Sequence, residues 1–287
     1  MGDSEKDLTY VSVIFGNVLS SIPSHLSIIN AANNMPHSVT RQIYVMGLDN
    51  WNALEKERYY HPRHDWIYCG PEASISQEEI NRLGLDKFVA NHYGKPTKFG
   101  HLLNKIYVLY LARQKGYKKT VLIDFDCFPL LERDQQYYDL INSRSQVFQA
   151  PMCYYRADYN TAAWNCGNRH IASWKKNDKT AMANSGWLYI TEDAVVENAI
   201  NAMRNMEIHS TMTDEPYLFY GFEKFMGREI SVEEYHENHE SLVTFLPRYE
   251  LCSEKTKAKK VNYFIHPFAW KGRGKHIYVN KYFKEYN

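Results

Sequence analysis

Short apolar runs alternate with longer segments of helical spacing along the first part of the chain. The runs that predict buried strands cover residues 9–16, 41–47, 65–70 and 120–123. Between them, residues 18–34 and 98–116 carry apolar side chains at helical spacing. Ser76 with Glu79 three residues later forms a capping box, which predicts a helix start. Strands that alternate with helices predict an α/β protein with a mainly parallel central sheet.

The later part of the chain has a more mixed pattern. The predicted strands are residues 185–190, 242–246 and 262–266. The predicted helices are residues 192–206 and 214–227. The polar and basic run at residues 254–260 is typical of a solvated loop. Because no repeat or low-complexity segment divides the chain, we predict a single domain over residues 1–287.

Composition narrows the classes of partner and the compartment. The net charge is +1, with 34 Lys and Arg against 33 Asp and Glu, which gives no reason to expect nucleic acid or an anionic membrane as the main partner. The five Cys are odd in number and form no CxxC pair, which favours a reducing compartment with free thiols. With no signal-peptide pattern and no run of about 18 apolar residues, we predict a cytoplasmic protein without a membrane span.

The strand at residues 120–123 leads into Asp124 and Asp126 within the run VLIDFDCF. Side chains two positions apart on an extended chain point to the same side, and ligands of parallel sheets bind at the carboxyl ends of the strands. A carboxylate pair there suits a hard divalent cation, which takes oxygen ligands and commonly bridges to a phosphate. An N-cap Asp followed by a surface Asp is the alternative, since the DxD pattern is common.

Other segments follow the carboxylate pair in a defined order. Lys105 lies in the helix before it, NSGWLYI covers residues 184–190, and TDEPYLF contains Asp214 and Glu215. The run IHPFAWKGRGK begins just before His266. With these segments the chain resembles the GT-A glycosyltransferases, and among them the glycogenin-like and galactinol-synthase-like enzymes of family 8.

The chain also departs from the family 8 pattern. Phe125 stands between the two Asp residues where the family has Ala, and Glu215 stands where it has Gln. The spacing from His266 to Lys271 is looser than the His-x-x-Gly-x-x-Lys of the family.

The resemblance implies a fold and a reaction. It implies a single GT-A, Rossmann-like domain with a mainly parallel central sheet and helices on both faces. Residues 9–130 would form the nucleotide-sugar half, and residues 131–287 the acceptor half with a C-terminal loop for metal and diphosphate. The reaction would move a sugar from a nucleoside diphosphate, most simply UDP, to a hydroxyl of a glycan, polyol or glycoprotein, with retention and with Mn²⁺ or Mg²⁺ as cofactor. Homo-oligomerisation stays open.

The resemblance also assigns roles to residues. The implied metal ligands are Asp124, Asp126 and His266. The implied donor-binding residues are Phe15, Gly16, Asn17, Lys105, Asp124, Asn184, Ser185, Gly186, Lys271 and Lys275. The implied catalytic residues are Asp214 and Glu215, one of which would be the base if the enzyme inverts, or would hold the donor sugar if it retains.

Each of these residues has a structural alternative. Lys105 on an apolar helix could extend its ammonium to solvent, and His266 before Pro267 could simply be packed. Asn, Ser and Gly at residues 184–186 favour turns in any protein. Asp214 could be an N-cap acid favoured by the helix dipole. Lys271 and Lys275 could belong to a solvated basic loop.

Two further clusters of residues are candidates for a functional role. His61, His64 and Asp65 could form a metal trio, although no further ligand pattern supports it. Residues 153–170 form a polar and aromatic stretch without strong periodicity. It could be a long loop that recognises the acceptor, or a segment that only packs against the rest of the protein.

Three other functions compete with glycosyl transfer. A phosphatase of the haloacid-dehalogenase type would use Asp124 as its nucleophile, but that motif usually opens the chain and needs a later acidic pair. A protein that binds nucleotide sugars or glycans without turnover would use the same residues. A nucleotidyltransferase would want a Gly-rich signature after the first strand, and FGNVLSS is not one.

Overall fold

The computed structural model describes fifteen stretches of the chain. They are residues 8–16, 40–56, 64–93, 100–124, 128–129, 147–149, 152–156, 165–166, 169–170, 175–176, 179–183, 186–209, 214–230, 243–245 and 264–266. The helix predicted at residues 18–34 and the loop predicted at residues 254–260 lie outside them.

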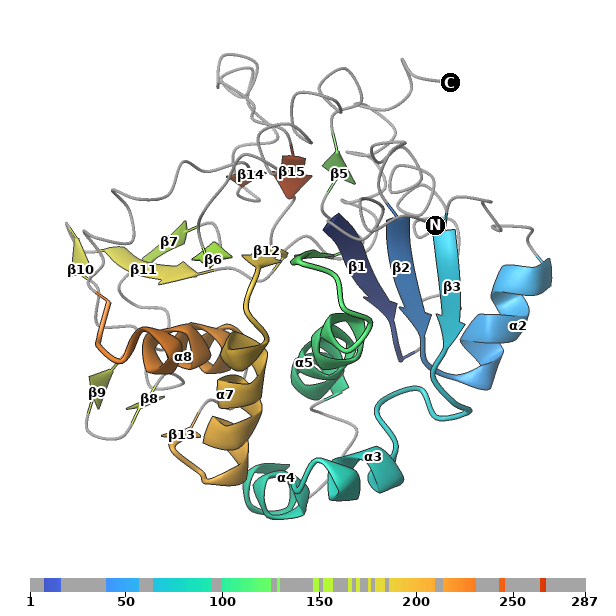
Figure 1. Cartoon of the computed structure of the whole chain (residues 1–287), viewed down its shortest axis with the longest axis horizontal. Helices are drawn as coiled ribbons and strands as arrows, with labels where there is room; N and C mark the ends of the chain where they lie inside the picture. Colours follow the sequence, from blue (N-terminus) through green and yellow to red (C-terminus); the bar gives the residue numbers. More distant parts are fainter. Residues whose placement is uncertain are drawn as a thin grey trace.

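A six-stranded sheet forms the centre of the described structure, in the order β3-β2-β1-β4-β12-β6 (Figure 1). Its strands are β1 (Leu8–Ile14), β2 (Thr40–Val45), β3 (His64–Tyr68), β4 (Lys119–Ile123), β6 (Phe148–Gln149) and β12 (Trp187–Ile190). The four strands from β3 to β4 are parallel, whereas β12 runs antiparallel to both β4 and β6. The prediction of an α/β protein with a mainly parallel sheet is therefore confirmed.

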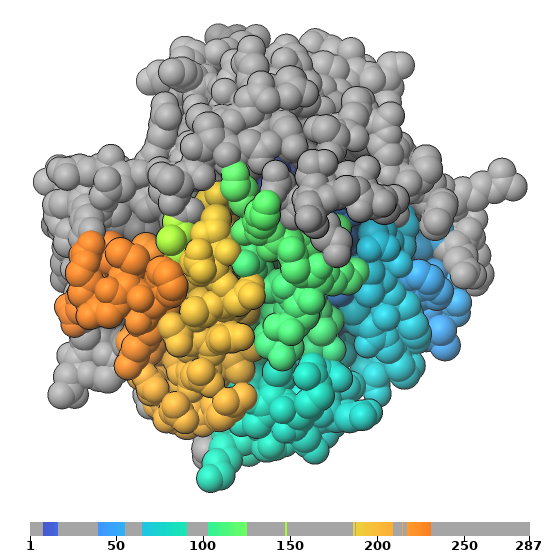
Figure 2. Space-filling model, in the orientation of Figure 1, coloured from blue at the N-terminus to red at the C-terminus, as the bar shows by residue number. Residues whose placement is uncertain are grey.

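Helices cover both faces of this sheet in the described part of the chain. They are α2 (Leu48–Lys56), α3 (Gln77–Arg82), α4 (Asp86–Tyr93), α5 (Gly100–Arg113), α7 (Asp193–Arg204) and α8 (Glu215–Met226). One core joins Val11 and Leu122 of the sheet to buried side chains of α5, α7 and α8. A smaller core on the other face joins Ile14 and Ile43 to Leu54 of α2. Figure 2 shows α5, α7 and α8 side by side in green, yellow and orange.

Three smaller sheets lie outside the central one, in the orders β10-β11-β7, β13-β8-β9 and β14-β15-β5. Their strands are β5 (Phe128–Pro129), β7 (Met152–Arg156), β8 (Asn165–Cys166), β9 (Arg169–His170), β10 (Lys175–Lys176), β11 (Lys179–Ala183), β13 (Ile208–His209), β14 (Val243–Phe245) and β15 (Phe264–His266). The strands predicted at residues 242–246 and 262–266 correspond to β14 and β15. Within the stretch 153–170, the structure describes most of β7 together with β8 and β9.

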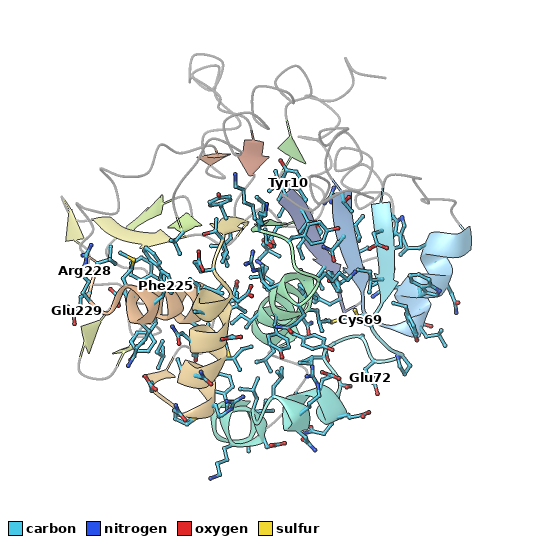
Figure 3. The ribbon with its side chains drawn as sticks, viewed as in Figure 1. Tyr10, Cys69, Glu72, Phe225, Arg228 and Glu229 are labelled. Atoms are coloured by element: carbon cyan, nitrogen blue, oxygen red, sulfur yellow. The ribbon has the colours of Figure 1, made fainter. Side chains whose placement is uncertain are left out.

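The helices α7 and α8 pack closely at Gly221. A Cβ at this position would overlap the carbonyl oxygen of Val195 and would lie 3.0 Å from the amide nitrogen of Ala199. Only glycine allows the two backbones this approach. Further along, α8 ends at Gly227, and the exposed Phe225 lies in its last turn (Figure 3).

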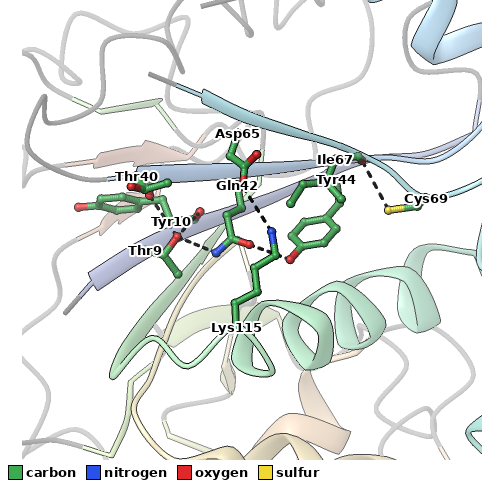
Figure 4. Close-up of polar contacts among 9 residues, drawn as sticks. All are labelled: Thr9, Tyr10, Thr40, Gln42, Tyr44, Asp65, Ile67, Cys69 and Lys115. Carbon is green, nitrogen blue, oxygen red and sulfur yellow. Dashed lines mark hydrogen bonds and ion pairs between the residues drawn. The ribbon is translucent and has the colours of Figure 1, made fainter. Parts of the chain in front are cut away.

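A ladder of buried polar side chains crosses β1 and β2 (Figure 4). The Tyr44 hydroxyl donates to Gln42 Oε1 at 2.8 Å, and Gln42 Nε2 donates to Thr9 Oγ1 at 3.0 Å. Thr9 Oγ1 in turn donates to the carbonyl of Thr40 at 3.1 Å. Burial raises the pKa of Tyr44, so its hydroxyl remains a donor. The ladder links the two strands at side-chain level and fixes their register.

Candidate functional site

The carboxyl ends of β1 and β4 lie at the point where the order of the parallel strands reverses. From β1 the chain continues to β2 and β3 on one side, while β4 pairs with the other side of β1. In open α/β sheets, ligands bind outside the carboxyl ends of the strands at such a point. Phe15 and Gly16 follow β1 there, and Asp124 follows β4.

Lys105 joins two carboxylates at this edge. Its Nζ lies 2.8 Å from Asp124 Oδ2 and 4.0 Å from Asp214 Oδ1. The Lys105 side chain is 13% exposed, so its ammonium does not extend to solvent. The structure thereby excludes the interpretation of Lys105 as a surface lysine with a buried stem.

Asp214 comes to this cluster from the start of α8. Its carboxylate is 7% exposed and, within the described residues, makes no capping hydrogen bond to the helix. Asp214 occupies the N-cap position of α8, in line with the structural alternative, and its carboxylate also lies 4.0 Å from Lys105 Nζ. α8 begins at Glu215, directly after Asp214, and the Glu215 side chain lies outside the described part of the structure.

Gly186 is a further predicted residue at this edge. Its carbonyl accepts a 2.9 Å hydrogen bond from the backbone N–H of Asp124, just before β12 begins. Segments from α5, β4, β12 and α8 thus meet around Asp124, although they are far apart in the sequence. This arrangement can bind a cation or a polar ligand, since it offers carboxylates and an ammonium together.

The loop after β3 holds the end of β1 in place. Gly16 has a φ of +61°, its N–H donates to the Ala73 carbonyl at 2.6 Å, and its own carbonyl accepts from Asn50 Nδ2 at 2.8 Å. Among the described residues, no atom lies within 4 Å of the position that a Cβ would take at Gly16. Asn104, next to Lys105, accepts from the Ile75 N–H at 2.8 Å. The same loop therefore contacts both β1 and α5.

Sequence reasoning missed Asn50 and Asn104. Both are buried, at 4% and 0% exposure, and both connect backbone segments that are distant in sequence. The one available signal was Asn104, a polar side chain inside the apolar helical pattern of residues 98–116, since a buried polar group usually requires a hydrogen-bond partner. Asn50 gave no such signal, because no helix was predicted around it.

The late strand β15 pairs with β5, the short strand that follows residues 124–126 along the chain. Ile265 of β15 pairs with Phe128 of β5, which lies two residues after Asp126. Paired residues of antiparallel strands have Cα atoms about 5 Å apart, so the backbone of His266 lies close to the motif. The side chain of His266 is not among those described.

Several predicted site residues cannot be placed in this way. They are Asn17, Asp126, Asn184, Ser185, Lys271 and Lys275, all of which lie outside the described residues. The proposed metal trio is not supported: His61 also lies outside, and Asp65 pairs with Lys115 at 3.3 Å. The described ranges contain no group of three or more His, Cys, Asp or Glu that could hold a metal ion. In the same ranges, no helix has the length and apolar character needed to cross a membrane.

A surface pocket of about 480 Å³ lies at the opposite edge of the sheet. Its lining includes Arg113, Lys119 and Thr191, at the start of β4 and the end of β12. Arg113 donates to the Asp193 carboxylate at 2.5 Å and to the Thr191 carbonyl at 2.6 Å, so its guanidinium holds α5, α7 and the sheet together. None of the predicted site residues lines this pocket.

Comparison with known proteins gives matches only among solved structures. No family model and no curated protein matches the chain. Mouse xyloside xylosyltransferase 1 is 11% identical, with 91% of this chain and 98% of that chain covered and a TM-score of 0.49. A glycosyltransferase involved in glycosylation of the major capsid of PBCV-1 is 10% identical, with coverages of 96% and 99% and a TM-score of 0.46.

A third solved structure is a 4-diphosphocytidyl-2C-methyl-D-erythritol synthase from Anaerococcus prevotii. It is 10% identical, with coverages of 98% and 97% and a TM-score of 0.43. Glycosyltransferases are thus among the structures to which the chain is similar, at low identity.

Proposed function

We propose that this protein is a metal-dependent glycosyltransferase of GT-A architecture, with a single domain over residues 1–287. It would move a sugar from a nucleoside diphosphate, most simply UDP, to a hydroxyl of a glycan, polyol or glycoprotein, with retention at the anomeric carbon. The observation that carries the proposal is the meeting of Asp124, Lys105 and Asp214 at the carboxyl ends of β1 and β4. An edge of this kind is where parallel α/β sheets bind nucleotides.

Asp124, Asp126 and His266 would hold Mn²⁺ or Mg²⁺. Asp124 fits this role because Lys105 engages its Oδ2 atom, which leaves Oδ1 for a cation, and because its side chain is 24% exposed. His266 fits because the β15–β5 pairing returns its backbone to the motif, and a mixed set of carboxylate and imidazole ligands suits Mn²⁺. When bound, the cation would neutralise the departing diphosphate.

The residues around Asp124 would orient the donor sugar. Lys105 fixes the Asp124 carboxylate and can offer its remaining protons to a donor hydroxyl or phosphate. Asp214 lies within 4.0 Å of the same ammonium, where its carboxylate would accept hydrogen bonds from the sugar near the anomeric carbon. Glu215 follows directly and would share this task. If the enzyme inverts, one of the two would take the proton of the acceptor hydroxyl.

The remaining assignments follow from position. Phe15, Gly16 and Asn17 follow β1, where base and ribose would lie. Residues 184–186 would line the sugar, since Gly186 contacts the backbone of Asp124. Lys271 and Lys275 would supply positive charge to the diphosphate.

A nucleotide-sugar panel with Mn²⁺ tests the proposal. The measured quantity is release of nucleoside diphosphate, with and without simple glycan and polyol acceptors. We expect Asp126→Asn to lower release at least about a hundredfold, in the range seen when one group that stabilises transition-state charge is removed. The matched control is Asp65→Asn, which removes an exposed carboxylate at the amino end of β3 and should leave release near the wild-type rate.

The same panel separates the competing functions. Full activity of Asp126→Asn would overturn the proposal. Phosphate release from a simple phosphomonoester that depends on Asp124 would indicate a phosphatase instead. Tight donor binding without any diphosphate release, under all acceptors tried, would indicate a binding protein.

A further inference from the structure

The guanidinium of Arg41 is buried within the central sheet, on the strand β2. Arg41 of β2 is 1% exposed, and its Nη2 donates a 2.7 Å hydrogen bond to Ser12 Oγ on β1. Ser12 is 0% exposed, and its hydroxyl donates to the carbonyl of Ile123 on β4 at 2.8 Å. This relay crosses three strands and ends one residue before Asp124.

The relay begins where the backbone ladder stops. The pairing of β1 with β4 ends at Val11 and Leu122. At the next position the Ser12 hydroxyl donates to the Ile123 carbonyl, in place of a backbone hydrogen bond between the two strands. The N–H on the other side of the same peptide unit, that of Asp124, donates to the Gly186 carbonyl at 2.9 Å. Both polar groups of the Ile123–Asp124 peptide are therefore anchored, which fixes the direction of the Asp124 side chain.

Arg41 determines the direction of the Ser12 hydrogen bond. A guanidinium only donates, so Ser12 Oγ must accept from it and must send its single proton elsewhere. The carbonyl of Ile123 receives that proton. A neutral amide in place of Arg41 could both donate and accept, and the hydroxyl would then have two orientations.

Stability alone does not account for this arrangement. Burying a charged group carries a large desolvation cost, and replacement of a whole buried ion pair by apolar side chains of similar volume is often neutral for stability, so a buried charge is weak evidence for a stabilising role. A guanidinium in the interior of the sheet is therefore more consistent with a requirement for a defined geometry.

We propose that Ser12 and Arg41 are positioning residues for Asp124. They hold its backbone from one face of the sheet, while Lys105 holds its carboxylate from the α5 side. The relay itself is independent of function, and only its consequence for turnover rests on the glycosyltransferase proposed above.

Ser12→Ala tests this inference against a matched control on the same strand. The control is Thr9→Val, which also removes a 0% exposed hydroxyl that donates to a carbonyl, that of Thr40 at 3.1 Å. Thr9 lies at the other end of β1, far along the strand from Asp124. We expect the two variants to lose similar amounts of thermal stability, because each loses both the hydrogen bond that its hydroxyl donates and the one that it accepts, from Arg41 in Ser12→Ala and from Gln42 in Thr9→Val.

Two readouts separate positioning from stability. The first is amide hydrogen exchange at Asp124, which should become at least about tenfold faster relative to the Ile43 amide in Ser12→Ala and should not change in Thr9→Val. The second is kcat for donor turnover, which should fall tenfold to a hundredfold in Ser12→Ala alone, with a smaller change in KM, as expected for a displacement of about 1 Å.

The outcomes are distinct. Equal exchange at Asp124 in the two variants overturns the inference, whether turnover is present or not. A wild-type protein without diphosphate release refutes the proposed function but leaves the exchange comparison to decide the positioning role. If Ser12→Ala does not fold, the comparison is made on Ser12→Cys, which keeps the volume and weakens the donor.

Discussion

Replacing Gly221 with Ala has two opposing effects on the free energy of unfolding: helix propensity should raise it, and helix packing should lower it. Gly221 lies inside α8, where Ala would be favoured over Gly by about 1 kcal/mol on propensity alone. The added methyl group would overlap the Val195 carbonyl and approach the Ala199 amide nitrogen at 3.0 Å. Both obstacles are backbone atoms of α7, which cannot rotate away as a side chain could.

The magnitude follows from these two terms. Overpacking of a core costs about 1–3 kcal/mol, and a backbone obstacle places this site at the upper end. Subtracting the gain in propensity leaves a net loss of about 2 kcal/mol in the free energy of unfolding. For a chain of 287 residues this corresponds to a decrease in Tm of about 3 °C.

Thermal and urea unfolding of Gly221→Ala measure this loss. The control is Gly116→Ala, where a Cβ would have no described atom within 4 Å and the φ of +81° opposes the substitution. α8 also carries Asp214 at its start, so separation of α8 from α7 should move this carboxylate away from Lys105 and lower turnover. A rise in Tm for Gly221→Ala would refute the close contact between the two helices.

Two further predictions concern charge and burial. Lys105→Met should lower the free energy of unfolding by about 2 kcal/mol and turnover by at least about a hundredfold, because two carboxylates lose their shared cation. The control is Lys224→Met: the Lys224 side chain is 51% exposed and pairs with Glu207, so its loss should change the free energy of unfolding by less than about 0.5 kcal/mol. Equal losses for the two variants in chemical denaturation would contradict this prediction. Burial raises the pKa of the Cys69 thiol to about 12 from 9.0. Because the thiolate is the reactive form, alkylation of Cys69 at pH 8, measured by mass spectrometry, should be about a thousandfold slower in the native than in the unfolded protein. Similar alkylation rates in the two states would exclude the raised pKa.

The Cys69 shift also has a consequence for stability. Because the folded state raises this pKa, folding favours the neutral thiol, and the contribution is fully present below pH 9. It should be lost as the pH rises from about 9 towards 12.

The central elements could be predicted because their patterns are local. The helix predicted at residues 192–206 is α7, Asp193–Arg204, with six buried apolar residues at helical spacing. The strand predicted at residues 9–16 ends earlier, at Ile14, because Gly16 adopts a positive φ and bonds to the loop after β3. The helix α2 was not predicted, since its sequence LDNWNALEK is mostly polar and buries only a narrow stripe.

The candidate site was predictable only in part. Lys105, Asp124 and Asp214 were found through the order of motifs along the chain, and the structure brings them together. Ser12 and Arg41 gave no signal, because a hydrogen bond between a hydroxyl and a carbonyl 111 residues away leaves no periodic pattern in the sequence. A serine within a strand is also compatible with ordinary packing.

The pairing of β15 with β5 joins opposite halves of the polypeptide. Contacts between such distant segments require closure of a long loop, and they form late in folding because the entropy of that loop must be overcome first. A nascent chain on the ribosome would therefore lack this edge until residues 264–266 had emerged. Affinity for the proposed donor would then report on synthesis of the chain as far as β15, and a saturating donor would stabilise the last of these contacts to form.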